Sequence, residues 1–564
     1  MRIGRLGLLG LATLVAACEE QPPTPPAMYR VGGTIAGLAG GNLTLQLNGQ
    51  QSLTRGAEGP FSFETPLVDG SAYAVTVAAT PPEQTCSVEG GTGKVTGADV
   101  SSVQVRCATR TYTLGGTVEG LRGTLGLSLG GETLQVTTNG AFTFTTGLPR
   151  GGTYTVGVAT QPANQRCTVS NGSGTVAGNV TDLSVRCADW YTLDTFQAAT
   201  VVLGQGDFTS KAPDRGGSTN AGTLRNPLGN PAFAQGRLYV PDTGSNRVLG
   251  FNGIPTANGA SAGFVLGQAD LADFETGSGE QGLGAPEGLS IDADRLAVAD
   301  TRNSRVLLHS TLPASTGAIP SLVVGQQSLD PEARLPGCGR TSFSFPEDVF
   351  LGRGKLLVAD SANNRVLVWN TVPTTNAAPA DLVLGQGSFT TCVENDANGD
   401  GVRDATSGAT TLWNPTGVWT DGTRLVVADS YNNRVLLWNQ FPTTDGQPAD
   451  VVLGQANFTS RAPALTASGM NTPYTVTSTG LQLFVTDSQH HRVLVWNALP
   501  TSNGTPADSV LGQADFTHAH LNDPPTGTTP SGRTFNQPGG VLLTWPHVVV
   551  SDYGNHRLLV FQSR

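Results

Sequence analysis

The sequence predicts an all-β protein that is built from internal repeats. Glycine supplies 73 of the 564 residues, whereas charged residues make up only 13% of the chain. Long surface helices need Lys, Glu and Arg on their outer face, so this composition favours short strands joined by glycine turns. Two kinds of repeat extend the prediction: two small antiparallel β-sandwich modules, followed by six longer units that each contain several strands.

The overall charge excludes one broad class of function. The formal net charge is −11, whereas a protein that binds nucleic acid presents a basic surface. We therefore expect no nucleic-acid partner. The hydrophobic content of 38% is too high for a disordered chain, so we expect folded domains.

The N-terminal residues predict export and a lipid anchor. Residues 1–17 have the basic start and short apolar middle of a secretory signal, which is too short to span a bilayer. Residues 14–18 (Leu-Val-Ala-Ala-Cys) resemble a bacterial lipobox, which implies lipidation of Cys18; an ordinary signal peptide is the alternative. The proline-rich residues 18–28 predict an extended tether. Because Glu19 and not aspartate follows the cysteine, the resemblance implies anchoring in the outer membrane of a bacterial cell envelope.

Residues 29–108 and 111–188 are two copies of one module. The run Val31–Ile35 (VGGTI) matches Leu114–Val118 (LGGTV), and apolar residues alternate with Thr, Ser and Gly. This alternation is the period of a strand with one buried face. The modules resemble the tandem immunoglobulin-like modules of bacterial surface lipoproteins. They contain no histidine and no motif of catalytic spacing, so we interpret them as a stalk, with adhesion to carbohydrate or protein as the alternative.

Six further cysteines fall into three pairs by position. An even number of cysteines in an exported chain predicts disulfide bonds, and the Cys-x-x-Cys spacing of many metal sites does not occur. Closing a loop of about 20 residues in this way contributes roughly 3 kcal/mol. The predicted pairs are Cys86 with Cys107, Cys167 with Cys187, and Cys338 with Cys392, of which the last joins neighbouring units of the C-terminal repeat.

From residue 195 to residue 564 the chain repeats six times. Each unit has a proline before a short strand, a strand ending in aspartate, a four-residue turn and an arginine that begins another strand. A strand with the motif Val-Leu-Gly-Gln, or one close variant, accompanies each unit. Units of this length with several strands predict a six-bladed β-propeller. The first such motif, in residues 200–205, precedes the first complete unit, so we expect it to complete the sixth blade.

The run Val358–Val366 (VADSANNRV) and its five relatives closely resemble the NHL repeat, which forms six-bladed propellers. The resemblance covers residues 195–564. It implies a platform that binds protein or RNA or, in one branch of the family, a metal-dependent lyase acting on peptidyl-hydroxyglycine. One fold carries many functions, so the resemblance alone does not choose between them.

The repeated charged residues are interpreted as structural. An aspartate and an arginine five positions apart across a tight turn are placed to pair, and asparagine and glycine in the turn readily adopt left-handed conformations. Because the pair recurs in all six units, we expect no catalytic role for it. Trp369, Trp438 and Trp496 recur at one strand position and are interpreted as core.

An insert in the fourth unit predicts a calcium site. Oxygen-bearing side chains stand at positions one, three, five and nine of the run 396–404, with glycine at position six, as in calcium-binding loops. Ser407 stands where an EF-hand has its bidentate glutamate, so the run is closer to the short calcium loops of extracellular repeat proteins. A flexible polar loop is the alternative. The predicted ligands of calcium, the one cofactor expected, are Asp396, Asn398, Asp400, the carbonyl of Val402, and Asp404.

Histidines and glutamates at one end of the predicted ring are the remaining candidates. Zinc binding by histidines of the last two units is one interpretation, but in the turns they replace asparagine or serine, which favours a structural role. Glu287 and Glu347 follow two of the six prolines and could hold a cation, although we expect a solvated rim. The histidines are His490, His491, His518, His520 and His556, and the residues after the other four prolines are Leu228, Thr416, Tyr474 and Gly539.

These observations predict an exported, membrane-anchored lipoprotein whose propeller is a non-catalytic binding platform for a protein or a glycan at the cell envelope. The alternative is an extracytoplasmic metal-dependent enzyme, a lyase or a hydrolase. No catalytic residue is assigned. Polar side chains from several blades that converge at the channel mouth would favour the enzyme.

Overall fold

The computed structural model describes residues 24–329, 335, 337–522 and 527–564. The predicted signal peptide (1–17), the predicted lipidation site Cys18 and residues 18–23 of the tether lie outside the described residues. The described chain is all-β, and its helices are short 3-10 turns. In this part of the chain no helix is long and apolar enough to cross a membrane.

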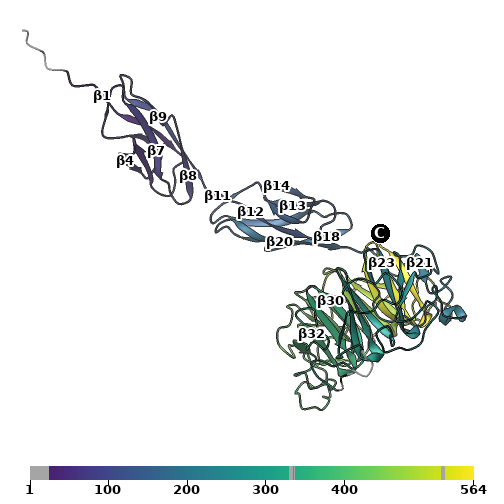
Figure 1. The fold of residues 1–564 in the computed structure, drawn as a ribbon. Coiled ribbons are helices and arrows are strands. Elements are labelled where there is room, and N and C mark those ends of the chain that lie inside the picture. Colours follow the sequence, from purple (N-terminus) through teal and green to yellow (C-terminus); the bar gives the residue numbers. More distant parts are fainter. Residues whose placement is uncertain (1–23, 330–334, 336, 523–526) are drawn as a thin grey trace, which may run out of the picture. The chain divides into compact units, whose positions relative to one another are not determined.

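The chain divides into two compact units (Figure 1). Unit 1 comprises the residues up to Pro162 together with Cys167–Cys187, and unit 2 comprises Ala163–Arg166 together with Ala188–Arg564.

Unit 1 contains two modules with the same sheet topology. Each module has two four-stranded sheets, ordered β5-β2-β10-β8 and β4-β3-β7-β9 in the first, and β15-β12-β20-β18 and β14-β13-β17-β19 in the second. In each module the two sheets share one buried core, because alternate side chains of each strand point inward. The strands are β2 (Val31–Ala36), β3 (Leu43–Leu47), β4 (Gln51–Arg55), β5 (Gly59–Ser62), β7 (Ala72–Ala79), β8 (Gln84–Glu89), β9 (Thr92–Lys94), β10 (Val100–Thr109), β12 (Leu114–Glu119), β13 (Leu125–Leu129), β14 (Glu132–Val136), β15 (Gly140–Thr143), β17 (Thr153–Thr160), β18 (Gln165–Ser170), β19 (Ser173–Thr175) and β20 (Val180–Asp189).

Each module contains one parallel strand pair, which differs from the antiparallel prediction. β10 runs parallel to β2 and β20 runs parallel to β12, so strands from the start and the end of each module lie side by side. Parallel neighbours need a long connection, which the intervening strands provide. The close approach requires glycine, because a Cβ at Gly33 or Gly116 would lie 1.8 Å from a carbonyl oxygen of the parallel strand.

All three predicted disulfides are present. Cys86–Cys107 and Cys167–Cys187 fasten the last strand of each module to its neighbour, β8 or β18. Cys338–Cys392 joins the loop that precedes one sheet of unit 2 to the loop that follows the same sheet. The cysteine spacing therefore predicted the pairing correctly.

The described part of unit 2 contains six four-stranded antiparallel sheets, one for each sequence repeat. β21 (Val201–Leu203) pairs with β44, which confirms that the leading strand completes the sheet of the last repeat. The other strands are β22 (Ala232–Ala234), β23 (Arg237–Asp242), β24 (Arg247–Phe251), β25 (Phe264–Leu266), β26 (Pro286–Asp292), β27 (Arg295–Asp300), β28 (Arg305–His309), β29 (Leu322–Val324), β30 (Pro346–Gly352), β31 (Lys355–Asp360), β32 (Arg365–Trp369), β33 (Leu382–Leu384), β34 (Pro415–Thr420), β35 (Leu425–Asp429), β36 (Arg434–Trp438), β37 (Val451–Leu453), β38 (Pro473–Ser478), β39 (Leu483–Asp487), β40 (Arg492–Trp496), β41 (Ser509–Leu511), β42 (Pro538–Thr544), β43 (His547–Asp552) and β44 (Arg557–Gln562).

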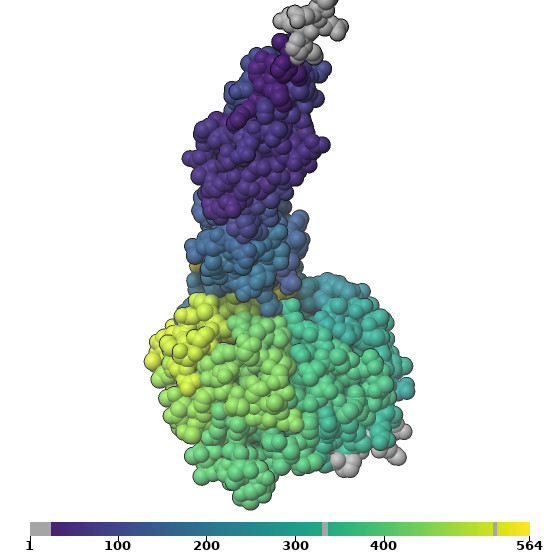
Figure 2. Space-filling view, turned by 90° about the vertical axis from the view of Figure 1, so that its left-hand side faces the viewer, coloured from purple at the N-terminus to yellow at the C-terminus, as the bar shows by residue number. Residues whose placement is uncertain are grey.

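The sheets of unit 2 pack against one another in chain order. The first strand of each sheet contacts the first strand of the next, and β42 of the last sheet contacts β22 of the first. Both faces of central strands such as β32 are buried between neighbouring sheets. Trp369, Trp438 and Trp496 lie in these cores, as predicted. Successive segments of unit 2 lie beside one another at the surface, from teal through green to yellow (Figure 2).

The predicted aspartate–arginine pair forms in all six of these sheets. In each, arginine Nε donates to aspartate Oδ2 at 2.7 Å, and both side chains are fully buried. The other carboxylate oxygen accepts a backbone N–H from the preceding loop, as Asp429 does from Trp413 at 2.7 Å. Arg434 also donates to the carbonyls of Gly408 and Phe458, which lie in the loops before and after the sheet. Each pair thus holds a hairpin turn and two loops together.

The Asp429→Ala substitution is expected to destabilise unit 2 by about 3–5 kcal/mol, because it leaves the Arg434 charge buried without its partner. Urea unfolding of the full chain, followed by tryptophan fluorescence, reports on unit 2, since all seven tryptophans follow residue 188. The matched control, Asp292→Ala, removes a partly exposed pair with Arg295 and should cost at most about 1 kcal/mol. Equal losses in the two variants would contradict this role for the buried pair.

Candidate functional site

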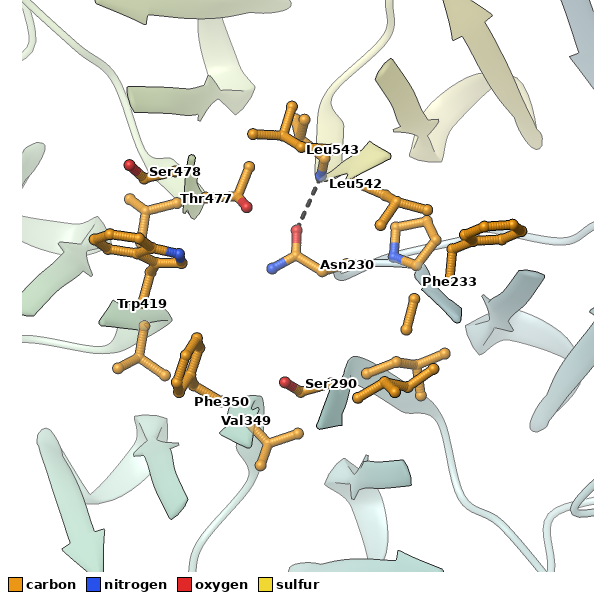
Figure 3. A pocket seen from close by; sticks show the side chains of 17 residues that line it. Asn230, Phe233, Ser290, Val349, Phe350, Trp419, Thr477, Ser478, Leu542 and Leu543 are labelled. Atoms are coloured by element: carbon orange, nitrogen blue, oxygen red, sulfur yellow. Dashed lines mark hydrogen bonds between the residues drawn. The ribbon is translucent and has the colours of Figure 1, made fainter. Parts of the chain in front are cut away.

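Two cavities lie among the first strands of the six sheets of unit 2. The cavity that we call the turn pocket has a volume of about 320 Å³ and lies where these strands begin, next to the 3-10 turns. The cavity that we call the strand pocket has a volume of about 210 Å³ and lies further along the same strands (Figure 3). The turn pocket is lined by Leu228, Glu347, Asn414, Thr416, Ser430, Tyr431, Thr472, Tyr474, Ser488, Gln489, Gln537 and Tyr553.

The strand pocket is lined mostly by apolar side chains. Phe233, Phe350, Trp419 and Leu542 surround it from four different strands (Figure 3). The Oδ1 atom of Asn230 accepts a hydrogen bond from the backbone N–H of Val541 at 2.9 Å, so this amide oxygen has a partner within the protein. The described residues that line the pocket include hydroxyl groups but no charged side chain.

The turn pocket combines an aromatic surface with many hydrogen-bonding groups. Every lining residue except Leu228 carries a hydroxyl, amide or carboxylate group. Tyr431 is 51% exposed. Its ring packs edge-on against Trp413, with the ring centroids 5.5 Å apart, and the guanidinium of Arg403 lies 4.1 Å from the Trp413 ring. These contacts hold the Tyr431 ring in place at the pocket.

Three carboxylates, which we call the acidic cluster, lie at or beside the turn pocket: Glu287, Glu347 and Asp348. Glu347 and Tyr474 line the pocket, and Tyr474 Oη donates to Glu287 Oε2 at 2.6 Å. Asp348 Oδ2 accepts the backbone N–H of Val418 at 2.9 Å. Glu347 Oε2 and Asp348 Oδ1 are buried and have no hydrogen-bond partner among the described residues. The cluster therefore keeps unused acceptor capacity.

Burial raises the pKa of every carboxyl group in the acidic cluster. Removal from water and the charges of Glu347 and Asp348 hold the pKa of Glu287 well above its ordinary value, although the Tyr474 hydrogen bond opposes them. Burial raises the pKa of Glu347 to about 7 and the pKa of Asp348 to about 7. A positive charge beside the cluster would favour its ionised form.

The expectation of a solvated rim is wrong for Glu287, whereas Glu347 is half-buried and lines the turn pocket. Glu287 is only 7% exposed, and its neighbour in the cluster, Asp348, is 1% exposed. Tyr474, which comes from a different sheet, binds Glu287. The sequence does contain a signal for this cluster, because two adjacent acidic residues follow Pro346 in a strand that is otherwise apolar, and buried strands rarely carry charge.

The predicted calcium loop closes through its own hydrogen bonds. The Asp396 carboxylate, in a residue that is 3% exposed, accepts the backbone N–H of Gly399 at 2.8 Å and of Gly401 at 2.9 Å. Asp404 Oδ2 accepts the N–H of Ala397 at 2.8 Å. The other predicted ligands, Asn398, Asp400 and Val402, lie in the same turn. Among the described residues no three His, Cys, Asp or Glu side chains are placed to hold one metal ion, so calcium binding stays a prediction.

Two turn histidines take the place of asparagine. His491 and His556 adopt the left-handed conformation, with φ of 53° and 54°, that Asn433 adopts in an earlier sheet. Their Nδ1 atoms accept the backbone N–H groups of Gln537 at 3.1 Å and Asn226 at 3.0 Å. In the same way, Asn433 Oδ1 accepts the backbone N–H of Thr472, in the loop that leads into the next sheet. Burial lowers the pKa of His491 to about 4 and lowers that of His556. The structural interpretation of these two histidines is confirmed.

The other candidate histidines bind aspartates locally. His490 Nδ1 lies 2.9 Å from Oδ2 of Asp487, the aspartate of the buried pair in its own sheet. His518 Nδ1 lies 2.7 Å from Asp515 Oδ1, and the rings of His518 and His520 are 5.4 Å apart. The His518 and Asp515 side chains are about half exposed, at 44% and 51%.

The Glu347→Gln substitution is expected to stabilise unit 2 increasingly, relative to the wild type, between about pH 5 and about pH 8. The folded-state pKa of Glu347, about 7, lies above the ordinary value of 4.5, so the folded wild type holds an extra proton in this range. The free energy of unfolding of the wild type therefore falls as the pH rises. The total loss is on the order of 1 kcal/mol for each pKa unit that separates the folded value from the ordinary value, and glutamine removes this loss. Unfolding followed by tryptophan fluorescence measures the difference, with exposed Glu280→Gln as control; a pH-independent difference would contradict the pKa.

One calcium ion is expected to bind loop 396–404, and Asp396→Ala should weaken this binding at least about tenfold by removing a central carboxylate. Isothermal titration calorimetry of the full chain with calcium measures the affinity. Asp294→Ala, at an exposed aspartate outside the loop, is the control. Absence of calcium binding, or binding that Asp396→Ala leaves unchanged, would show the calcium prediction to be wrong.

No protein-family model matches the chain, and no curated protein matches it. Among solved structures, the computationally designed Ika8 protein is 10% identical with a TM-score of 0.30, over 65% of this chain and 100% of that chain. A chain of the nidogen/laminin complex is 16% identical with a TM-score of 0.27, over 51% of this chain and 85% of that chain. At such low TM-scores neither likeness carries an argument about fold or function.

Proposed function

We propose that this protein is an exported glycan-binding protein, which holds its ligand in the turn pocket without converting it. The observation that carries the proposal is the pocket lining, in which every residue except Leu228 offers a hydroxyl, amide or carboxylate group. Pockets for drug-like ligands are instead lined mainly by hydrophobic side chains with a few polar groups. Thr416, Ser430 and Tyr474 already form hydrogen bonds within the protein. A ligand rich in hydroxyl groups can bind the remaining hydrogen-bonding groups of this lining.

The exposed tyrosine supports the same ligand class. One face of a sugar ring presents C–H groups, which pack on an aromatic ring, while the hydroxyl groups at its edge form hydrogen bonds. Tyrosine suits this task because it offers an apolar ring and a polar end. Tyr431 is exposed at the pocket and is held by Trp413.

The shape of the turn pocket favours a glycan over a folded protein partner. Stable protein–protein interfaces bury about 1,200–2,000 Å² in total, over many residues of each partner. The turn pocket is a concave space of about 320 Å³, which is the scale of small-ligand sites.

We assign unit 2 to six-bladed β-propellers of the NHL type as part of this proposal. Support comes from the six four-stranded sheets, from the contacts of their first strands in chain order, and from the contact of β42 with β22. The pairing of β21 with β44 adds to it. In this arrangement the turn pocket lies at one end of the central channel.

The two modules of unit 1 are proposed to be β-sandwiches that serve as a stalk. Each has two four-stranded sheets around one core. Three disulfides support an extracytoplasmic location. We further propose, from the sequence, a lipid anchor at Cys18 and attachment to the outer membrane of a bacterial envelope.

Two observations favour the second candidate function, an extracytoplasmic lyase or hydrolase. Polar side chains from different sheets converge at the turn pocket, where Tyr474 Oη donates to Glu287 Oε2 at 2.6 Å. Glu347 lines the turn pocket and has a pKa of about 7, which is the value suited to a general acid or base near neutral pH. Analysis of the ligand after prolonged incubation separates the two functions, because an enzyme yields product and a binding protein returns the ligand unchanged.

Tyr431→Ala is expected to weaken oligosaccharide binding about tenfold, because it removes the exposed ring of the pocket. Saturation-transfer NMR with the full chain and a panel of neutral, acidic and amino oligosaccharides identifies the ligand, and calorimetry measures its affinity. Phe274→Ala, which removes a 42% exposed ring that does not line the pocket, is the matched control. The proposal fails if no oligosaccharide binds, or if both substitutions weaken binding equally.

A further inference from the structure

Glu347 is the one charged residue among the described residues that line the turn pocket, and the rest of the acidic cluster adjoins it. The buried arginine of the same sheet does not neutralise the cluster, because Arg365 binds its own partner, Asp360, at 2.7 Å. A cavity that carries carboxylates and has walls of low dielectric attracts cations.

Two oxygens of the acidic cluster lack a hydrogen-bond donor. Glu347 Oε2 and Asp348 Oδ1 are buried and have no partner in the described part of the chain, and Asp348 as a whole is 1% exposed. An unpaired buried acceptor costs free energy, and so does the mutual repulsion of neighbouring carboxylates. A ligand that brings positive charge beside Glu347 offsets the repulsion between the neighbouring carboxylates.

An organic cation needs fewer ligands at this site than a metal ion does. Calcium takes six to eight oxygen ligands at about 2.3–2.6 Å. An ammonium group has three N–H donors and is satisfied by a few acceptors in a looser arrangement. Tyr431 and Tyr553 also line the pocket, and tyrosine rings attract ammonium groups.

The walls favour an amino sugar over a lysine side chain. Lysine reaches a carboxylate through an aliphatic stem of four carbons, which packs best on apolar surface. In the turn pocket Leu228 is the one aliphatic lining residue, and the other described lining residues offer hydroxyl, amide or carboxylate groups. An amino sugar presents hydroxyl groups around its ammonium group and so matches such walls.

We propose that the turn pocket selects glycans that carry a free amino group, with the ammonium paired to the Glu347 carboxylate. The hydrogen bond between Tyr474 and Glu287 keeps the tyrosine in position beside this pair. This inference rests on the proposed glycan-binding function and names the ligand class within it.

Three matched oligosaccharides of equal length test the inference: β-1,4-linked glucosamine, N-acetylglucosamine and glucose. They differ only at C2, which carries an ammonium, an acetamide or a hydroxyl group. In calorimetry of the full chain near pH 7 we expect the glucosamine oligomer to bind at least about tenfold more tightly than the other two. Glu347→Gln should remove this preference, so that the three oligomers bind the variant with about equal affinity.

Two controls separate the charge of Glu347 from a loss of structure. Glu280→Gln, at an exposed glutamate outside the pocket, should keep the full preference. Glu347→Asp keeps the charge but withdraws it by one methylene, so it should keep part of the preference. Tryptophan fluorescence of each variant verifies that unit 2 is folded.

The pH dependence gives a second readout. The titratable groups that face Glu347 are Glu287 from β26, its neighbour Asp348 from β30 and Tyr474 from β38. As the pH falls through about 7, Glu347 takes up a proton and so does the amine of the glucosamine oligomer, so affinity for this oligomer should pass through a maximum at intermediate pH while affinity for the glucose oligomer stays constant.

Each other outcome decides a different point. Equal affinity for the three oligomers overturns this inference and leaves the proposed function standing. If neither these three nor any other oligosaccharide binds, both this inference and the proposed function are overturned. Binding of a lysine-rich peptide in their place would assign the site to a protein ligand. A preference that Glu347→Gln retains would overturn the pairing with Glu347.

Discussion

The buried pair of aspartate and arginine is the interaction on which unit 2 depends. Two fully buried charges cost desolvation free energy, which is offset only when geometry and additional hydrogen bonds satisfy both groups. Here the aspartate accepts both the arginine Nε and a backbone N–H, and the arginine donates to carbonyls in two loops. The pair therefore defines the loop conformations as well as the hairpin, at a place where water cannot reach.

The candidate site follows from this arrangement. The loops held by the pairs lead directly into the prolines that begin the first strands, and Glu347 and Tyr474 come immediately after two of these prolines. The 3-10 turns between aspartate and arginine bring Tyr431 and Tyr553 to the same cavity. Rigid turns thus supply the aromatic wall, while the first strands supply the carboxylates.

Much of the fold could be predicted from the sequence because it repeats. The six aspartate–arginine pairs, the role of β21 and the turn histidines all follow from comparing one unit with another. The acidic cluster could not be predicted in this way, because it departs from the repeat. Tyr474 and Glu287 are 187 residues apart, and whether their side chains meet depends on how the sheets between them pack. The parallel pairs of unit 1 also escaped prediction, because strand alternation reveals which face is buried but not the direction of the neighbour.

Neighbouring sheets of unit 2 are linked by a side chain that accepts a backbone N–H from the loop before the next sheet, and the chemistry of this acceptor differs around the unit. Asn246, Asn364 and Asn433 accept a backbone N–H at three of these links, and an amide has no proton to take up near physiological pH. On the two sides of the sheet that β21 completes, the acceptors are instead His491 and His556. A protonated imidazole has no free lone pair and cannot accept a hydrogen bond. Strong acid would therefore remove the hydrogen bonds on either side of the sheet in which the leading and trailing strands of unit 2 meet, while the asparagines keep theirs.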